Sequence, residues 1–198
     1  KNRLTVTNQW TFQAGNIEKR FDIVFLINGL PLVIAEAKTP TRSSVTWFDG
    51  AYQIHELYEK QVPAMFVPNV FSFASEGKCL RYGSIRMPID LWGPWRDEDH
   101  AEEGELSHVQ STVESLMRPA VVLDILQNFT LFATDKKHRR IKIICRYQQY
   151  ETTNKLLARV IAGYPKKGLI WHFQGSGKSL LMVFAAQKLR LDPRLGNP

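Results

Sequence analysis

Two acidic residues and a lysine lie at the ends of two apolar runs, an arrangement suited to metal-assisted chemistry on phosphate. Residues 22–38 read Asp-Ile-Val-Phe-Leu-Ile-Asn-Gly-Leu-Pro-Leu-Val-Ile-Ala-Glu-Ala-Lys. Asp22 opens the first run, and Glu36 and Lys38 close the second. Apolar strands rarely carry charged groups at their ends unless those groups meet something charged. Two carboxylates can hold Mg²⁺ through oxygen, and an ammonium can lie beside a reacting phosphate.

A β-hairpin must position these residues, because both runs are rich in Val and Ile and flank an Asn-Gly pair. With a two-residue turn and regular pairing, Asp22 would lie opposite Ala35 and on the other face from Glu36. A three-residue turn over residues 27–29, with its glycine left-handed, would bring Asp22 onto the face of Glu36 and Lys38. Metal binding therefore predicts that bulged turn or an equivalent one-residue shift. The alternative is an edge hairpin whose terminal charges are only solvated.

A second chemical motif lies near the carboxyl end of the chain. Residues 168–182 read Gly-Leu-Ile-Trp-His-Phe-Gln-Gly-Ser-Gly-Lys-Ser-Leu-Leu-Met, which predicts a strand, a glycine-rich loop and a helix. Backbone N–H groups in such a loop can cradle phosphate oxygens, and the helix N-terminus adds its dipole. Lys178 would reach the β- and γ-phosphates of ATP, and Ser179 would hold Mg²⁺. The predicted nucleotide-binding residues are Gly175, Ser176, Gly177, Lys178 and Ser179.

Strands and helices alternate along the rest of the chain. Apolar periodicity, the positions of proline and glycine, and turn residues predict the bounds of these segments. Residues 39–46 are predicted to form a loop beside the charged cluster. Strands are predicted over residues 4–13, within 64–74 and over 79–85, and helices over residues 48–61, 106–117 and 119–132.

Charge is divided unevenly along the chain. The 198 residues carry a net charge of +7, and the 44% hydrophobic content argues against wholesale disorder. Residues 1–140 hold 16 Lys and Arg against 17 Asp and Glu, whereas residues 141–198 hold 10 against 2. This asymmetry predicts two modules, the second suited to polyanions such as DNA or nucleotide phosphates. The basic run 136–140 is predicted to be a linker or a DNA-backbone contact, and the acidic run 97–105 a solvated loop.

The sequence predicts a cytoplasmic protein without a membrane segment. No apolar run approaches the ~20 residues that a spanning helix needs, and the first residues do not resemble a signal peptide. Cys79 and Cys145 lie far apart without metal-ligand spacing, which favours buried thiols in a reducing compartment. The chain lacks an initiator Met and stops soon after the second motif. We therefore expect a piece of a longer protein that does not hydrolyse ATP competently by itself.

The first motif resembles a known nuclease family. Arg-Phe-Asp-Ile-Val at residues 20–24, Asn-Gly-Leu-Pro-Leu at 28–32 and Glu-Ala-Lys at 36–38 are similar to the PD-(D/E)xK core. More narrowly, they resemble the N-terminal region of type I restriction enzyme R subunits, with Phe21 in place of the motif's proline. The resemblance implies an α/β, restriction-endonuclease-like mixed sheet flanked by helices. Its expected domains are an N-terminally truncated nuclease at 1–135, a linker at 136–145 and the start of a RecA-like P-loop domain at 146–198.

The resemblance also implies roles for individual residues. Asp22 and Glu36 would bind Mg²⁺, with the Ala37 carbonyl as a possible further ligand. Lys38 would help to activate water or neutralise charge on the scissile phosphate.

In that family a following helix carries Gln and Tyr four residues apart, near the catalytic lysine. Here Gln53 and Tyr58 are five apart. Either a one-residue insertion distorts the helix, or only one of the two residues serves the catalytic role.

The second motif resembles helicase-type motors. Trp-His precedes the loop, and Arg-Tyr-Gln-Gln at residues 146–149 places Gln148 where such motors read adenine through an amide. His172 stands in place of the usual first glycine. The resemblance implies an ATP-dependent type I site-specific deoxyribonuclease that translocates and cuts double-stranded DNA with modification and specificity subunits. The alternatives are an inactive nuclease fold that only clamps DNA for a motor, and a repair-type nuclease–helicase.

Overall fold

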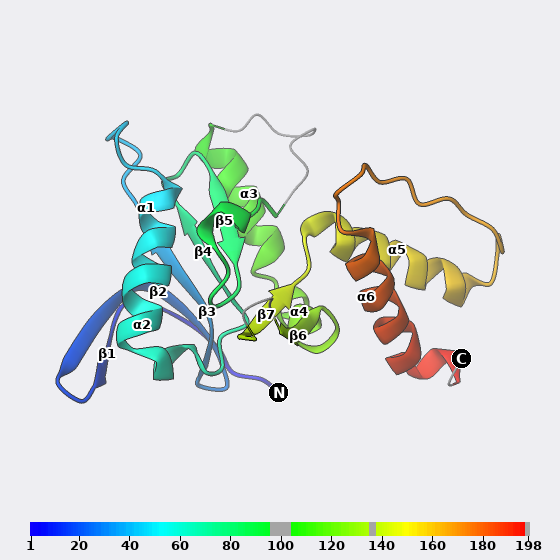
Figure 1. Ribbon diagram of the computed structural model, residues 1–198, viewed down its shortest axis with the longest axis horizontal. Helices are drawn as coiled ribbons and strands as arrows, with labels where there is room; N and C mark the ends of the chain where they lie inside the picture. The colour runs from blue at the N-terminus through cyan, green and yellow to red at the C-terminus, as the bar shows by residue number, and fades with distance from the viewer. Residues whose placement is uncertain (96–103, 135–137, 197–198) are drawn as a thin grey trace.

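The computed structural model describes residues 1–95, 104–134 and 138–196, in which a twisted sheet is covered by helices on both faces (Figure 1). Neighbouring strands are antiparallel except for β3 and β4, which run parallel. The predicted mixed α/β sheet is therefore confirmed, and it is consistent with a nuclease-like fold. The strands lie in the order β1 (Leu4–Ala14), β2 (Ile17–Ile27), β3 (Leu30–Ala37), β4 (Phe71–Ser75) and β5 (Leu80–Gly83).

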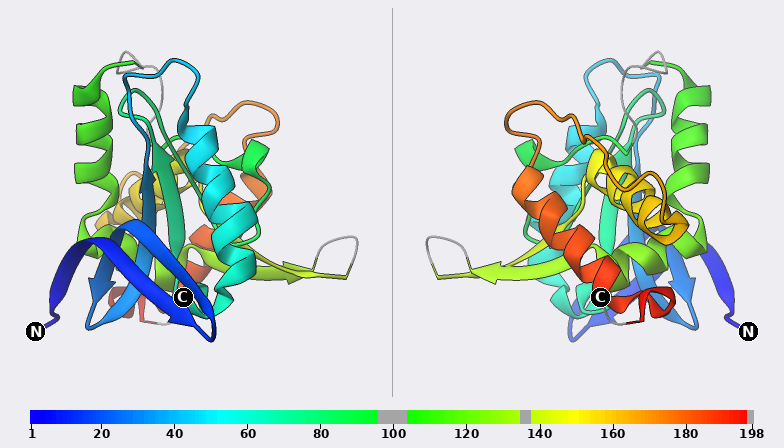
Figure 2. Two further views of the ribbon diagram at one scale, coloured as in Figure 1. Left: turned by 90° about the vertical axis from the view of Figure 1, so that its left-hand side faces the viewer. Right: turned by 90° about the vertical axis from the view of Figure 1, so that its right-hand side faces the viewer.

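The sheet separates two hydrophobic cores. Helix α1 (Trp47–Tyr52) and its continuation cover one core, to which Ile34 of β3 contributes. Helices α3 (Leu106–Leu116) and α4 (Pro119–Asn128) cover the other core, where the preceding residue Val33 is buried. Consecutive side chains of β3 therefore point to opposite faces, as a strand requires. The left view of Figure 2 places the sheet between α1 and α3.

The turn between β2 and β3 has two residues. Asn28 and Gly29 both have positive φ, 55° and 82°, and Ile27 pairs with Leu30 across them. This is the backbone that an Asn-Gly pair favours in a tight hairpin, because both residues tolerate the left-handed region. The three-residue turn predicted from the metal hypothesis is therefore wrong.

The one-residue shift lies inside the hairpin instead of at its turn. Leu26 pairs with Pro31, but Phe25 pairs with Val33, so Leu32 is the extra residue of a bulge in β3. Proline has no N–H to give to the ladder, and such positions are compatible with bulges. A bulge of one residue reverses which side chains share a face further along the strand. The equivalent shift that the metal hypothesis requires is therefore present.

The predicted helix over residues 48–61 forms, but it contains an inserted residue. It continues from α1 through a π-helical turn, η1 (Gln53–Tyr58), into α2 (Glu59–Gln61). The N–H of Glu59 donates to the carbonyl of Ile54, five residues back. Single π turns of this kind are inserted residues and occur frequently at functional sites.

The start of α1 is held close to the sheet. Thr46 and Asp49 form a capping box, in which the Asp49 carboxylate accepts from the Thr46 N–H at 2.7 Å. Gly50 allows the approach, because a Cβ there would lie 3.0 Å from Cβ of Ala74 and 3.4 Å from Cβ of Glu36. The helix is thereby fixed directly over the end of β3.

The chain beyond residue 129 packs on the second core. Strands β6 (Thr130–Thr134) and β7 (Arg140–Ile144) form an antiparallel hairpin. Part of the predicted linker is therefore a strand, while residues 136 and 137 of it lie outside the described residues. The Tyr82 hydroxyl of β5 donates to the Cys145 carbonyl at 2.7 Å, which ties the end of this hairpin to the main sheet.

Helices α5 (Tyr147–Ala162) and α6 (Lys178–Leu191) follow and share this core. The ring of Phe129 lies 4.9 Å from that of Tyr150 and 5.5 Å from that of Phe184. The two predicted modules are thus in direct contact through aromatic side chains.

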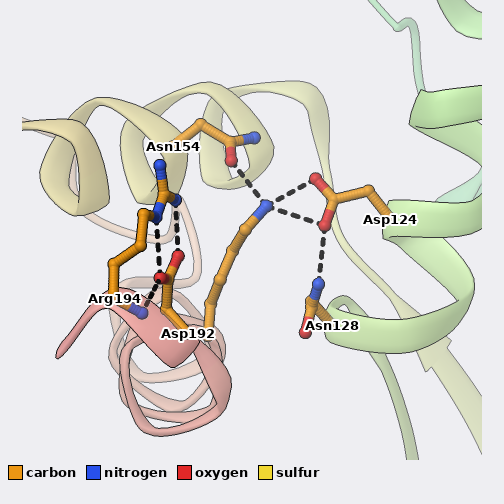
Figure 3. A network of polar contacts seen from close by, with 6 residues as sticks. Asp124, Asn128, Asn154, Asp192 and Arg194 are labelled. Atoms are coloured by element: carbon orange, nitrogen blue, oxygen red, sulfur yellow. Dashed lines mark hydrogen bonds and ion pairs between the residues drawn. The ribbon is translucent and has the colours of Figure 1, made fainter. Parts of the chain in front are cut away.

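A partly buried polar network reinforces this contact (Figure 3). Lys188 of α6 donates to Asp124 of α4 at 2.7 Å and to Asn154 of α5 at 2.6 Å. Asn128 donates to the same carboxylate at 2.7 Å. The side chains of Lys188 and Asp124 are only 12% and 17% exposed. Because removing one partner would leave a poorly hydrated charge, this network favours one arrangement of the three helices.

Several local predictions are confirmed and others are corrected. The first strand, the loop over residues 39–46, the edge strand and the helix over residues 106–117 are present. Residues 63–66 form a 3-10 turn, η2 (Pro63–Phe66), in place of a strand, because proline favours a first helical turn. Helix α4 ends at Asn128, since the following residues pair in β6. Most of the acidic run, residues 97–103, lies outside the described residues. Within the described ranges, no helix is long and apolar enough to cross a membrane.

One buried carboxyl predicts a pH-dependent stability. Glu59 is 9% exposed, and its Oε2 accepts from the Arg86 N–H at 2.8 Å. Burial raises the pKa of Glu59 from 4.5 to about 7. The folded chain then keeps a proton that the unfolded chain releases, so stability falls as pH rises from about 4.5 to about 7. Glu59→Gln removes this loss and should stabilise the protein by about 3 kcal/mol at pH 8, with little change near pH 4.5.

Urea unfolding at the two pH values measures this effect. Glu18→Gln, at an exposed carboxylate on β2, is the matched control and should show no such difference between the two pH values. An equal effect of Glu59→Gln at both pH values would contradict the prediction.

Candidate functional site

The shifted register gathers the predicted catalytic residues at the end of β3. Ile23 pairs with Ala35, so Asp22 lies opposite Glu36 and on the same face. Oδ2 of Asp22 accepts a hydrogen bond from the Ala37 N–H at 3.0 Å. Nζ of Lys38 donates to Oε1 of Glu36 at 2.8 Å. Two carboxylates and one ammonium therefore form a single cluster.

The π-helical turn brings two further predicted residues into this cluster. Lys38 Nζ donates to Oε1 of Gln53 at 2.6 Å, and Nε2 of Gln53 donates to the Tyr58 hydroxyl. That hydroxyl in turn donates to the Arg20 carbonyl at 3.1 Å. Because a π turn advances five residues for each hydrogen bond, positions 53 and 58 share a face. The structure therefore has the one-residue insertion, and both side chains join the cluster.

Burial gives the cluster unusual protonation properties. Glu36 is 2% exposed, and its burial, assisted by the charge of the neighbouring Asp22, raises its pKa to about 7 against the opposing hydrogen bond from Lys38. Burial, together with the charge of Glu36, raises the pKa of Tyr58 to about 12. The tyrosine therefore stays protonated at neutral pH and serves as a hydrogen-bond donor. Strongly perturbed groups that converge in one place are typical of functional sites.

The donor set fits a hard divalent cation. Oε2 of Glu36 is buried and has no hydrogen-bond partner among the residues that the structure describes. In a strand, the N–H and C=O of one residue point to the same side, so the Ala37 carbonyl faces the side on which its N–H meets Asp22. No group of three His, Cys, Asp or Glu clusters within the described ranges. A metal here would thus complete its shell with this carbonyl and water, as Mg²⁺ commonly does.

The glycine-rich loop has the backbone expected of a phosphate cradle. Gly175 and Gly177 have φ of 86° and 80°, and α6 begins directly at Lys178. Nζ of Lys178 donates to the carbonyls of His172 at 3.2 Å and Phe173 at 2.9 Å, so the ammonium is folded across the loop. Backbone N–H groups at this helix start and a nearby ammonium suit an anionic ligand.

The structure places Gln149, the neighbour of the predicted Gln148, on this loop. Nε2 of Gln149 donates to the Gly177 carbonyl at 3.0 Å, and its Oε1 accepts from the Arg146 N–H at 2.8 Å. Gln149 is 2% exposed, and a Cβ at position 177 would lie 2.4 Å from its amide nitrogen. Sequence reasoning missed Gln149, because two adjacent glutamines at a helix start are distinguished only by which one faces the loop. The assignment of adenine to Gln148 stays a prediction.

The strand predicted before the loop is not formed. Residues 168–173 have no ladder partner in the described part of the chain, and Leu169 and Trp171 are 84% and 86% exposed. A strand is stabilised by hydrogen bonds to a neighbouring strand, and its propensity alone does not suffice. A cavity of about 610 Å³ lies between this segment and α5, with Lys155 and Arg159 in its lining. It is separate from the carboxylate cluster.

Comparisons with known proteins give one family match over each motif. Residues 1–88 match the family described as type I restriction enzyme R protein N terminus, and residues 148–198 match the SWI2/SNF2 ATPase family. The chain is 34% identical over its whole length to the type I restriction enzyme HindI endonuclease subunit of Haemophilus influenzae. Over 84% of the chain it is 30% identical to a putative type I restriction enzyme endonuclease subunit of Methanocaldococcus jannaschii. A Staphylococcus aureus endonuclease subunit of the same type is 27% identical over 96% of the chain. The matches span 20%, 16% and 20% of these relatives, respectively.

Proposed function

Because this chain belongs to the type I restriction enzyme R protein family, we propose that it carries the Mg²⁺-dependent nuclease centre of an ATP-driven endonuclease acting on double-stranded DNA. The observation that carries the proposal is the convergence of Asp22, Glu36 and Lys38 on one face of the sheet. The one-residue bulge at Leu32 is needed for that convergence, and the inserted residue in η1 adds Gln53 and Tyr58 to the cluster. A hairpin whose terminal charges are only solvated requires neither insertion.

Asp22, Glu36 and the Ala37 carbonyl would hold the metal in this proposal. When bound, Mg²⁺ supplies a Lewis acid for the scissile phosphate and lowers the pKa of a water ligand. The chain supplies two carboxylates fixed by the sheet, one of which is desolvated and holds an unpartnered oxygen. That oxygen is the strongest local support for an oxygen-seeking cation.

Lys38 would neutralise charge on the phosphate and help to orient the attacking water. Its ammonium already lies between Glu36 and Gln53, so its direction is defined by two acceptors. Tyr58 would keep the Gln53 amide oriented, because its hydroxyl accepts from Gln53 and donates to the backbone. Preorganised charge of this kind stabilises a transition state more strongly in a partly desolvated site than in water.

The glycine-rich loop would bind the phosphates of ATP. Gly175, Ser176 and Gly177 would form the cradle, with Lys178 on the β- and γ-phosphates and Ser179 on a second Mg²⁺. Here the buried Gln149 would hold the loop carbonyl in place, while Gln148 would read adenine. We propose that residues 1–135 form the nuclease domain and residues 146–198 the start of a RecA-like motor, with residues 136–145, which contain β7, connecting them.

The proposed context is a cytoplasmic restriction complex. The relatives named above are endonuclease subunits of type I restriction enzymes, so further subunits for modification and specificity are the proposed partners. Residues 141–198, with 10 Lys and Arg against 2 Asp and Glu, suit contact with a polyanion.

A Mg²⁺ titration tests the proposed function. The full-length protein, assembled with its partner subunits, is incubated with supercoiled plasmid and ATP at increasing Mg²⁺. DNA binding is measured separately in EDTA. We expect binding without metal, and nicking that appears with Mg²⁺ and saturates. A protein that binds DNA but never nicks it at any metal concentration would be a scaffold. Efficient ATP-dependent cutting without the specificity subunit would point to a repair-type enzyme.

A further inference from the structure

Gln9 interrupts the β1–β2 ladder directly opposite Asp22. Asn8 pairs with Ile23 and Trp10 pairs with Phe21, whereas the residues between them make no ladder pair. Gln9 has φ of 51°, in the left-handed region that side chains with a Cβ rarely adopt. Strained backbone of this kind persists only where the surroundings hold it, and it gathers at functional sites.

The side chains of the two strands change the face of the sheet to which they point at this position. Residues two apart in a strand normally share a face, yet Phe21 lies in the core under α1 while Ile23 packs against the core on the opposite face. Trp10, which pairs with Phe21, also packs against the core under α1. The change of face therefore occurs at the pair of Gln9 and Asp22, which sets the direction in which the Asp22 carboxylate points.

The Gln9 side chain also reaches that carboxylate. Its Nε2 lies 3.4 Å from Oδ1 of Asp22, while the Ala37 N–H donates to Oδ2 at 3.0 Å. Each carboxylate oxygen has two lone pairs, so one donor on each oxygen fixes the carboxylate plane and leaves acceptor capacity for a cation. Gln9 is exposed, and its amide makes no contribution to either hydrophobic core.

We propose that Gln9 is a positioning residue of the nuclease centre, which orients the Asp22 carboxylate toward the metal through its amide and its left-handed backbone. The inference rests on the proposed function, because it presumes that Asp22 is a metal ligand. Partners that orient a ligating carboxylate typically change metal affinity or activity by about 10- to 100-fold when they are removed.

Replacement of Gln9 by glycine separates the amide from the backbone. Glycine adopts a left-handed φ without strain, so Gln9→Gly keeps the backbone shape and removes only the donor. We expect the Mn²⁺ dissociation constant of the full-length protein, measured calorimetrically without DNA, to rise about 10-fold. The Mg²⁺ concentration for half-maximal cleavage should rise by a similar factor, while the cleavage rate at saturating Mg²⁺ changes less.

Two further variants make the result specific. Gln13→Gly is the matched control, because Gln13 is an exposed glutamine of the same strand whose amide donates to the Gly15 carbonyl at 3.1 Å. It should leave Mn²⁺ affinity unchanged. Gln9→Asn retains an amide and tolerates the left-handed region, so its dissociation constant should rise less than that of Gln9→Gly. Melting temperatures, measured for every variant, show whether each is folded.

Asp22→Ala distinguishes failure of this inference from failure of the proposed function. If Asp22→Ala retains normal Mn²⁺ affinity and cleavage, the metal assignment itself is wrong. If Asp22→Ala loses both while a folded Gln9→Gly binds Mn²⁺ as the wild type does, the role of Gln9 alone is overturned. Equal loss of affinity in Gln9→Gly and Gln13→Gly would also overturn it, because the effect would then come from the strand and not from the amide.

Discussion

Asp22→Ala or Lys38→Ala should abolish DNA cleavage by the complete restriction complex while leaving ATP-driven translocation intact. Asp22 is one of two carboxylates that would hold the metal, and Lys38 is the ammonium directed at the phosphate. A metal ion contributes several kcal/mol of charge stabilisation, and each 1.36 kcal/mol is a tenfold change in rate. The expected loss in cleavage rate is therefore about 10³-fold or more.

Plasmid cleavage and a triplex-displacement assay of translocation measure the two activities on the same preparation. Glu18→Ala and Lys60→Ala remove exposed charges of the same types from β2 and from the helix above the site, and should cleave normally. Lys60 pairs only with Glu56 among the described contacts, at the surface, so its loss should cost little. Cleavage at the wild-type rate in Asp22→Ala would reject the nuclease assignment.

Lys178→Ala should abolish ATP hydrolysis and, with it, both translocation and cleavage. Lys178 is exposed and contacts only loop carbonyls in the described structure, so its replacement removes a charge from the cradle without opening a core. In a phosphate loop that charge faces the β- and γ-phosphates, where it stabilises the transferring group. We expect ATP turnover to fall by about 100-fold or more.

Steady-state ATPase activity in the presence of DNA checks this result. Lys155→Ala is the matched control, because this lysine on α5 is 73% exposed and pairs with Glu151 one turn away. It should keep near-normal turnover. Retained ATPase activity in Lys178→Ala would contradict the nucleotide site. Loss of cleavage in both Asp22→Ala and Lys178→Ala, with translocation lost only in the second, would show that the two motifs act in series.

Local sequence signals determined much of the fold and selected the candidate site residues. An Asn-Gly pair between Val- and Ile-rich runs specifies a tight hairpin, because few other residues accept two consecutive positive φ angles. Pro63 sets the end of the helix over residues 48–61. Gly175 and Gly177 specify a loop with two left-handed residues directly before α6, because glycine adopts positive φ without strain. Each of these signals depends on residues within a few positions of one another.

Tertiary structure alone decided how those residues meet. Whether Asp22 shares a face with Glu36 depends on a bulge at Leu32. A shift of the pairing register by one residue moves the side chains of a strand to the opposite face of the sheet. The π turn that unites Gln53 with Tyr58 is selected by contacts with the sheet, because an isolated helix gains nothing from the inserted residue.

Tertiary structure also decided three features that no local sequence signal predicts: a shifted pKa, a side-chain contact and a left-handed residue. The raised pKa of Glu36 comes from burial under α1, and the contact of Gln149 with the loop joins segments 28 residues apart. The left-handed Gln9 is held by a strand pair whose side chains enter different cores. Sequence patterns specify helices, strands and turns because conformational propensity is local. Strand register, close backbone approach and desolvation are instead set by packing between segments that are distant in the sequence.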